Sequence, residues 1–398
     1  MKQGWEYKKL GEVCEVVSGS TPKTNVPEYW GEGHYWVTPA ELNDTIVYID
    51  KTERQITDEA LTKTKLRLLP VGTVLLSSRA PIGKVAITKT EMYCNQGFKN
   101  CICSDSIYNK YLFYFLRLKK EYLNSLGRGA TFKEISKSIV ESISIPIPPK
   151  STQLSIVSEL DKINELIRLK KEQLKDYDNL AQSIFYEMFG DPVENDKGWE
   201  VKKLGELCDK ISNGYNAKLE EDTYKSEGIM YFRCQNVWRN YFDYSDLVYI
   251  DEDTNQKMKS SSLKHNDFLI TKIGRINTEN SSLGRVSLYE GEDDKANLSG
   301  NLCFARLKKD AAVHKFILYI LISNQFRNYI RRTTVGGIDK RALNVRQISS
   351  FPIISPPLPL QQLFAQRIEQ IEHQKSEVAK AITDLETLLA SRMQHWFE

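Results

Sequence analysis

The sequence has no long apolar run. None of its hydrophobic stretches approaches the ~18–20 residues that a membrane-spanning helix needs, and the first segment, MKQGWEYKKLGE, lacks the apolar core of a secretory signal. Hydrophobic residues still make up 41% of the 398 residues and charged residues 27%, which is typical of a folded globular chain. We therefore expect a cytoplasmic protein without membrane contact, and its length predicts more than one domain.

The sequence also lacks a metal-binding or disulfide pattern. Its seven cysteines are irregularly spaced, and the only close pair, Cys101 and Cys103, has no second pair and no histidine nearby. No two of the five histidines are three or four residues apart, so they form no cluster along the chain. We expect reduced, mostly buried thiols and no metal site.

Catalytic motifs are missing as well. There is no G-x-x-x-x-G-K-[ST] loop for ATP, and no G-x-S-x-G or H-E-x-x-H sequence. An adenine methyltransferase needs an Asn/Asp-Pro-Pro-Tyr/Phe motif, whereas the two Pro-Pro pairs follow Ile147 and Ser355. We predict no catalytic residue, although the many carboxylates leave a nuclease triad open. The net charge of +3 neither favours nor excludes nucleic acid.

The strongest positive feature is an internal repeat. The string GWEYKKLGE at 4–12 returns as GWEVKKLGE at 198–206, identical at eight of nine positions. At a second offset, PIPPKSTQL (146–154) lies over ISPPLPLQQ (354–362), and the glycine loop at 127–130 lies over 335–338. The middle of each half diverges, and the second half carries an expected insertion around Glu290–Asn297. This pattern indicates one scaffold, duplicated, with two different recognition surfaces.

Each repeat ends in a long heptad pattern. From Ile156 to Met188, nine of ten positions at alternating spacings of four and three are apolar; from Phe364 to Trp396, eight of ten are apolar or aromatic. A 3.5-residue period held for almost five heptads is typical of a coiled coil. Since no other long helix is expected, we predict that the two helices pair with each other, antiparallel, with a separate partner chain for each helix as the alternative.

These patterns predict an α+β fold with an internal pseudo-twofold repeat. Each globule is expected to be mixed α/β, with strands near 72–76, 84–88 and 142–146 and helical segments at 110–126 and 314–332. We predict globular domains at 1–150 and 191–358, separated by long helices at 151–190 and 359–398 that form an antiparallel coiled coil.

The same residues resemble the specificity subunit of type I restriction-modification enzymes, a family with two target-recognition domains, each followed by a conserved helix. The similar strings extend over almost the whole chain. They are GWEYKKLGEV, SGSTPKTNVPEYWGEG (18–33), SSRAPIGKVAI (77–87), NQGFKN (95–100), PIPPKSTQLSI (146–156) and LAQSIFYEMFGDP (180–192). The second half departs from the pattern, because ITKIGRIN and LSGNLC replace the third and fourth strings, so site residues transfer there less securely.

The resemblance implies a non-catalytic, sequence-specific subunit that binds double-stranded DNA and defends against phage. It implies two methyltransferase subunits and restriction or translocase subunits as partners. S-adenosylmethionine, ATP and Mg would then be bound by the partners, with no cofactor on this chain. The expected target is a bipartite, asymmetric sequence at which adenine methylation and cleavage are directed.

Candidate DNA contacts lie in polar, basic loops that contain glycine. Arg can bond guanine O6 and N7, amides suit adenine, and Lys or Ser can bind phosphate. The expected residues of the first half are Ser18, Thr21, Lys23, Ser78, Arg79, Lys84, Asn95, Gln96, Lys99, Arg128, Thr131 and Lys133. Those of the second half are Asn213, Tyr215, Lys218, Lys272, Arg275, Lys340 and Arg341.

Two other hypotheses remain at this stage. The chain could be a self-contained DNA endonuclease or methyltransferase that uses the same recognition domains, which the missing motifs disfavour. It could also be a coiled-coil adaptor without DNA contact, in which case the candidate loops are ordinary exposed turns.

Overall fold

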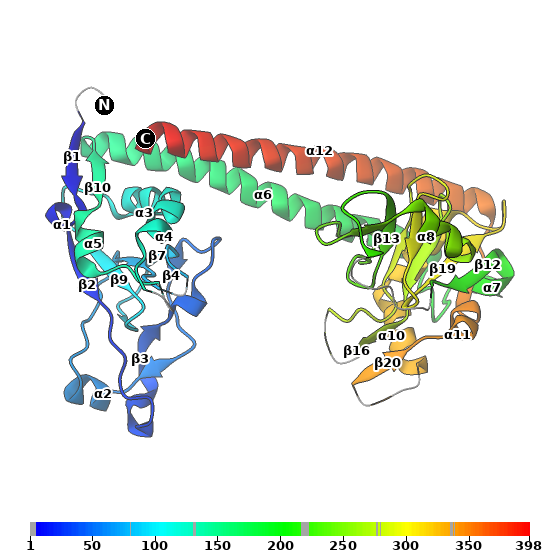
Figure 1. Cartoon of the computed structure of the whole chain (residues 1–398), viewed down its shortest axis with the longest axis horizontal. Coiled ribbons are helices and arrows are strands. Elements are labelled where there is room, and N and C mark those ends of the chain that lie inside the picture. Colours follow the sequence, from blue (N-terminus) through cyan, green and yellow to red (C-terminus); the bar gives the residue numbers. More distant parts are fainter. Residues whose placement is uncertain are drawn as a thin grey trace. The chain divides into compact units, whose positions relative to one another are not determined.

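The computed structural model describes residues 5–79, 81–129, 133–215, 223–275, 278, 280–334, 337 and 339–398. The chain divides into two compact units (Figure 1). Unit 1 contains Met1–Glu172 and Ala379–Glu398, and unit 2 contains Gln173–Val378. Each unit therefore combines one globule with one part of each long helix. No helix in the described part of the chain is long and apolar enough to cross a membrane.

Unit 1 is built on three small sheets. A five-stranded sheet has the order β2-β9-β6-β7-β4, a three-stranded sheet the order β5-β3-β8, and β1 pairs with β10. The strands are β1 (Glu6–Lys9), β2 (Cys14–Ser18), β3 (Trp30–Val37), β4 (Tyr48–Ile49), β5 (Gln55–Ile56), β6 (Val74–Leu76), β7 (Val85–Thr88), β8 (Tyr93–Cys94), β9 (Lys99–Cys103) and β10 (Ser144–Ile147). Its shorter helices are α1 (Leu10–Val13), α2 (Asp58–Lys63), α3 (Asn109–Leu118), α4 (Lys120–Leu126) and α5 (Lys137–Ser142).

Unit 2 repeats this plan with local changes. Its sheets have the orders β12-β19-β15-β17 and β14-β13-β18, and two pairs are formed by β11 with β21 and by β16 with β20. The strands are β11 (Val201–Lys203), β12 (Cys208–Asn213), β13 (Ile229–Phe232), β14 (Val248–Ile250), β15 (Phe268–Thr271), β16 (Ile273–Arg275), β17 (Val286–Leu288), β18 (Ala296–Leu298), β19 (Leu302–Leu307), β20 (Lys340–Ala342) and β21 (Pro352–Ile354). The helices are α7 (Leu204–Leu207), α8 (Glu252–Lys257), α9 (His314–Ile322), α10 (Asn324–Thr333) and α11 (Val345–Ser349).

Two strands of each larger sheet are buried throughout because both of their faces are covered. Every residue of β6, β7, β15 and β17 is buried, and a short run without alternation is typical of a strand packed on both sides. In unit 1, α3 buries six consecutive residues, Tyr111–Leu116, in the same hydrophobic core. In unit 2, α9 buries Phe316–Leu321 in the same way.

The repeated end strings form equivalent structures. Leu10 and Leu204 each donate a backbone hydrogen bond to the segment before the last strand, at Ile143 and Phe351 respectively. Gln153 accepts from the backbone of Tyr108 at 2.8 Å, and Gln361 accepts from Val313 at 3.0 Å. These buried glutamines fix the first turn of each long helix against its own globule.

The two long helices, α6 (Lys150–Phe189) and α12 (Leu358–Phe397), have 40 residues each. Gly190 ends α6 with a φ of 75°, a left-handed conformation that glycine adopts without strain. All twenty expected seam positions are buried or half-buried. Within unit 1, Lys171 contacts Glu386; within unit 2, Asp178 contacts Lys375. Since rising numbers on α6 meet falling numbers on α12, the pairing is antiparallel, as predicted.

The last turn of each helix fills the core of a globule. Phe397, at the end of α12, lies 5.0 Å from Tyr111 in unit 1, and Phe189, at the end of α6, lies 4.7 Å from Phe316 in unit 2 (ring centroids). The two charged residues of the α12 seam have partners inside the chain, because Lys375 pairs with Asp178 and Arg392 with Glu159.

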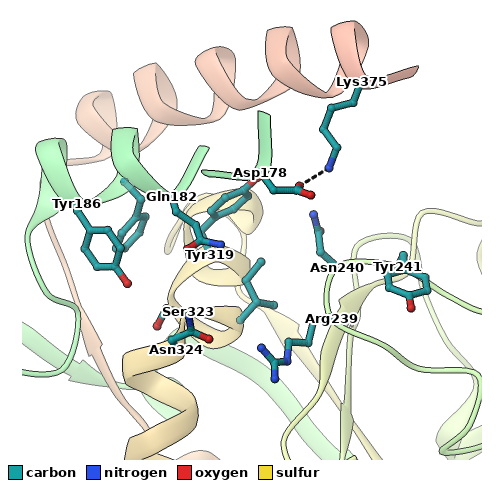
Figure 2. A pocket seen from close by; sticks show the side chains of 12 residues that line it. Asp178, Gln182, Tyr186, Arg239, Asn240, Tyr241, Tyr319, Ser323, Asn324 and Lys375 are labelled. Carbon is teal, nitrogen blue, oxygen red and sulfur yellow. Dashed lines mark hydrogen bonds and ion pairs between the residues drawn. The ribbon is translucent and has the colours of Figure 1, made fainter. Parts of the chain in front are cut away.

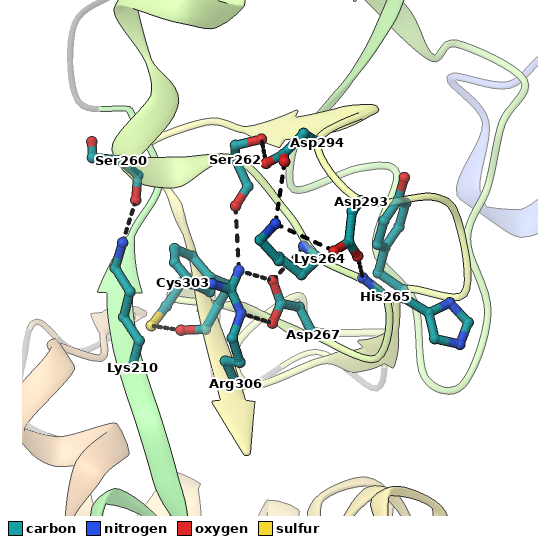
Figure 3. A network of polar contacts seen from close by, with 12 residues as sticks. Lys210, Ser260, Ser262, Lys264, His265, Asp267, Asp293, Asp294, Cys303 and Arg306 are labelled. Atoms are coloured by element: carbon teal, nitrogen blue, oxygen red, sulfur yellow. Dashed lines mark hydrogen bonds and ion pairs between the residues drawn. The ribbon is translucent and has the colours of Figure 1, made fainter. Parts of the chain in front are cut away.

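Two details differ from the sequence-based expectation. The helical segments at 110–126 and 314–332 are each two helices, which meet at Lys119 and at Ser323. An insertion near Glu290–Asn297 is present, and Asp293 and Asp294 tie it to Lys264 through ion pairs of 3.2 Å (Figure 3). A longer insertion lies elsewhere, in the connection from β15 to β17, and it contains β16.

Candidate nucleic-acid interface

The candidate loops of unit 1 are joined by a small set of backbone hydrogen bonds around Ser78, which we call the junction. Ser78 donates from its amide to Gly97 O at 2.7 Å, and its carbonyl accepts from the Ile135 amide at 3.0 Å. The first loop joins them, because Ser20 donates to Cys94 O at 2.9 Å. The four segments that the sequence analysis selected, near 18–23, 78–84, 95–99 and 128–133, therefore lie together.

Unit 2 contains the same junction at equivalent positions. Lys272 takes the place of Ser78: its amide donates to Asn301 O at 3.0 Å and its carbonyl accepts from Leu343 at 2.8 Å. Tyr215 takes the place of Ser20 and donates to Leu298 O at 2.9 Å. The loops near 213–215, 272–275 and 340–343 are thereby brought together.

A glycine permits the close approach of the chains in both junctions. A Cβ atom on Gly19 would lie 1.8 Å from Asn95 O, and one on Gly214 would lie 2.2 Å from Ser299 O. Real Cβ atoms do not come so close to a backbone oxygen, so a side chain at either position would separate the segments. Asn95 adds a local turn, in which its Oδ1 accepts from the Gly97 amide at 2.9 Å.

The basic side chains of unit 1 fall into two groups. Lys99 is 7% exposed and its Nζ lies 3.0 Å from Glu134 Oε1, and Lys84 Nζ donates to Pro39 O at 2.9 Å. These two ammonium groups are held by the protein itself. Arg128 and Lys133 are exposed and Arg79 is half-buried, and none of the three has a side-chain hydrogen bond or ion pair to a residue in the described ranges. The side chains of Arg79, Arg128 and Lys133 are therefore available to a ligand.

Unit 2 shows the same division. Lys272 Nζ donates to Asn213 Oδ1 at 2.7 Å, and burial lowers the pKa of this lysine. Arg341 donates to Arg331 O at 2.7 Å and to Thr334 O at 2.9 Å. Arg275 and Lys340 are exposed instead, and they line one open groove of about 430 Å³ with Asn280, Ser282, Arg285 and Asn301.

The other expected site residues lie around these junctions. Ser18, Lys23 and Gln96 are exposed, and Thr21 donates to the Gln96 side chain. Lys23 O accepts from Trp30 Nε1 at 3.3 Å, which fixes its backbone and leaves its ammonium outside that contact. Tyr215 is half-buried. Thr131 and Lys218 lie outside the described residues.

The sequence analysis missed a polar pocket in unit 2. A cavity of about 360 Å³ is lined by Asp178, Gln182, Tyr186, Arg239, Tyr241 and Asn324, among others (Figure 2). Arg239 stands on a tight hairpin in which Trp238 donates to Tyr241 O at 3.0 Å, and Arg285 lies 3.7 Å from the Trp238 ring. The short string VWRNYF has no alternation that would have predicted a hairpin.

The thiols are mostly buried. Five of the seven free cysteines are buried, and burial raises the pKa of Cys94 and Cys303 to about 12. In the part of the chain that the structure describes, no three His, Cys, Asp or Glu side chains come together as a group that could hold a metal ion.

Comparisons with known proteins agree with the fold and the repeat. The family model described as the type I restriction modification DNA specificity domain matches residues 2–176 and 196–386. A curated relative, the type I restriction enzyme MjaIX specificity subunit of Methanocaldococcus jannaschii, is 32% identical over 92% of this chain and 86% of its own length. The type I restriction enzyme EcoR124I/EcoR124II specificity subunit of Escherichia coli is 30% identical over 45% of this chain and 48% of its own length.

Solved structures share the fold along the whole chain. One chain, from work on complex assembly and conformational transition of the type I R-M system, has a TM-score of 0.63 at 20% identity, covering 99% of this chain and 97% of the other. The S subunit of the M. genitalium type I restriction-modification system has a TM-score of 0.53 at 14% identity, covering 99% and 96%. The resemblance expected from the sequence is confirmed. This chain belongs to the family of the type I restriction modification DNA specificity domain and carries that domain twice.

Proposed function

We propose that this chain is the non-catalytic DNA-recognition subunit of a type I restriction-modification complex, and that it recognises a bipartite, asymmetric target. The observation that carries the proposal is the duplicated junction. The backbone hydrogen bonds of Ser78 and Lys272 are equivalent, whereas the side chains around them differ. One scaffold with two different surfaces suits a target whose two halves have different sequences.

Each domain is proposed to contact DNA through its junction. Residues 1–150 and 191–358 act as the two recognition domains, and 151–190 and 359–398 form the spacer between them. Exposed Arg128, Lys133, Arg275 and Lys340 contact bases or phosphates, whereas the held ammonium groups of Lys99 and Lys272 position the loops. The groove-forming loops of unit 2 also offer amides suited to adenine.

Catalysis is proposed to lie on partner subunits. Two methyltransferase subunits would bind this chain and direct adenine methylation, with restriction or translocase subunits joining through them. S-adenosylmethionine, ATP and Mg would be bound by those partners. Leucines left exposed on the long helices offer apolar surface for such docking; they are Leu154, Leu166, Leu169, Leu180, Leu363 and Leu388.

The first test is a methylome comparison. Cells that carry this chain with the neighbouring methyltransferase are sequenced against cells that lack only this chain. We expect one split, asymmetric adenine-methylated motif to disappear with the chain. An unchanged methylome in an active system would contradict the proposal, and DNA binding by the purified chain would then be measured directly.

A second test addresses the spacer. One heptad is inserted into α6 and one into α12 at facing positions, which lengthens each helix by about 10 Å. The gap in the methylated motif should lengthen by about three base pairs, because base pairs are ~3.4 Å apart, and both half-sites should stay unchanged. A changed half-site with an unchanged gap would show that the helices do not set the spacing.

A further inference from the structure

Unit 2 has a two-stranded ribbon, formed by β16 and β20, that unit 1 does not have in its described residues. Strands β16 and β20 pair antiparallel, with Ile273 opposite Ala342 and Arg275 opposite Lys340. Figure 1 shows the ribbon at the end of unit 2 remote from α12. At the equivalent place, the described residues of unit 1 form isolated bridges, from Arg79 and from Arg128 to Glu134.

The inner face of the ribbon is anchored to the body of unit 2. A Cβ on Gly274 would lie 2.2 Å from the Leu283 amide, so only glycine fits at this contact. Opposite Gly274, the Arg341 guanidinium donates to the carbonyls of Arg331 and Thr334 at 2.7 and 2.9 Å. These contacts hold the strand pair in place without using its outer side chains.

The outer face carries an apolar pair and a basic pair. Because strand side chains alternate, Ile273 and Arg275 share one face, and Lys340 and Ala342 share the corresponding face of β20. All four residues are exposed, Ile273 to 37%. The packing of unit 2 therefore does not account for the exposed isoleucine in the strand.

The carboxylate of Asp339 lies beside the guanidinium of Arg275. Asp339 Oδ2 lies 3.3 Å from Arg275 Nε, and both side chains are more than half exposed. A carboxylate at this point repels phosphate, so it disfavours a backbone contact at the tip. The pair instead matches the major-groove edge of a G·C base pair, since guanine offers acceptors at O6 and N7 and cytosine offers a donor at N4.

We propose that the β16–β20 ribbon enters the major groove and that Arg275 with Asp339 recognises one G·C pair of the half-site of unit 2. Ile273 and Ala342 contact the C5-methyl group of a thymine nearby. The groove is wide enough for a two-stranded ribbon. Ile273 and Arg275 are about 6.6 Å apart along the strand, which places the thymine about two base pairs from the guanine. The inference rests on the proposed function and names the bases that one domain recognises.

The experiment changes single groups on the bases of the DNA. The purified complex with its methyltransferase subunits is titrated with the methylome-defined target, in which each guanine in turn is replaced by 7-deazaguanine and each thymine by deoxyuridine. For the unmodified protein we expect one guanine substitution to weaken binding on the order of tenfold and one thymine substitution to weaken it severalfold, both in the same half-site.

Two variants link these losses to side chains. Arg275→Ala should bind the normal target on the order of tenfold more weakly and lose its sensitivity to 7-deazaguanine at that position. Ile273→Ala should lose its sensitivity to deoxyuridine and keep the guanine effect. Lys257→Ala, an exposed lysine on α8, is the matched control and should behave like the unmodified protein. Unchanged amide hydrogen exchange in unit 2 confirms that each variant is folded.

Two outcomes overturn the inference and leave the proposed function intact. Arg275→Ala could retain full sensitivity to every guanine analogue, which would place its contact elsewhere. It could instead weaken binding equally on all sequences and lower the salt dependence, which is the behaviour of a phosphate contact. The absence of any split target for the unmodified complex would overturn the proposed function as well.

Discussion

The two units share a backbone junction, but its ammonium group comes from different segments of the chain. In unit 1 the group belongs to Lys99, which is paired in β9 opposite Ser18, and it reaches Ser78 Oγ at 3.4 Å. In unit 2 the position of Ser78 is Lys272, and the position of Lys99 is Cys303. The serine–lysine pair has thus become a lysine–cysteine pair. Backbone hydrogen bonds keep the junction, and the side chains around it are free to change.

A second pair of equivalent positions differs more strongly. Thr73 precedes β6 and Ile102 lies in β9, whereas the matching positions of unit 2 hold Asp267 and Arg306. Asp267 is fully buried, and its two oxygens accept from Arg306 at 2.8 and 2.6 Å (Figure 3). The hydrogen bonds to Asp267 raise the pKa of Arg306, so the guanidinium stays charged throughout the ordinary pH range. At these positions unit 1 therefore has a threonine that donates to Pro70 O at 2.7 Å and a half-buried isoleucine, whereas unit 2 has an ion pair.

The largest effect is expected from breaking that ion pair. Asp267→Ala should lower the stability of unit 2 by about 3 kcal/mol, because removal of one partner leaves the other charge half-buried and unpaired. Amide hydrogen exchange measures the loss in each unit separately. The double variant Asp267→Thr/Arg306→Ile carries the residues of unit 1 and should recover most of the stability. A double variant as unstable as the single one would contradict this comparison.

The next largest effect is expected from glycine substitutions in the shared part of the junction. Gly19→Ala and Gly214→Ala should each cost about 1–3 kcal/mol, because the new Cβ meets a backbone oxygen that cannot move away cheaply. Thermal unfolding of each unit and DNA binding are the measurements. Gly337→Ala is the control, since the nearest atom lies 3.6 Å from its added Cβ. If only one of the two variants lost stability and DNA binding, the two glycines would not have equivalent roles.

A smaller effect should distinguish the cations of unit 1 that bind DNA from those that hold the loops in position. Arg128→Ala should weaken DNA binding severalfold and lower the slope of log affinity against log salt by about 1, as expected for a lost phosphate contact. Lys99→Met should leave this slope unchanged and destabilise unit 1 by about 1 kcal/mol, since Ser78 and Glu134 lose their partner. A reduced slope for Lys99→Met would place its ammonium on DNA.

The sequence predicted the parts that repeat. The Pro-rich anchor strings located the starts of α6 and α12, and the heptad spacing identified the seam residues from Ile156 to Trp396. Strong periodicity over many residues makes such elements recognisable. The segments that meet at the junctions were also found, because their glycines and polar residues stand at matching places in both halves.

The roles of individual cations could not be predicted. Lys99 and Arg128 both lie in polar, glycine-containing strings, yet one is buried against Glu134 and the other is exposed. Burial depends on partners far along the chain, which a single sequence does not reveal. The β16–β20 ribbon was missed for a similar reason, since three residues are too few for alternation and its two strands are distant in sequence.

The smallest expected effect concerns the helix ends in unit 1. Hydrogen bonds from Arg392 hold the pKa of Glu159 below its usual range, and Trp396 Nε1 adds another at 3.0 Å. A depressed carboxyl pKa stabilises the folded state above the unfolded pKa, and this contribution is lost as the pH falls through the folded value. Glu159→Gln should therefore lower the stability of unit 1 slightly at neutral pH and have no effect in strong acid. Asp178→Asn, on the α6 segment of unit 2, is the control and should leave the acid unfolding of unit 1 unchanged. A difference between Glu159→Gln and the unmodified protein that persisted in strong acid would show that the glutamine disturbs packing rather than charge.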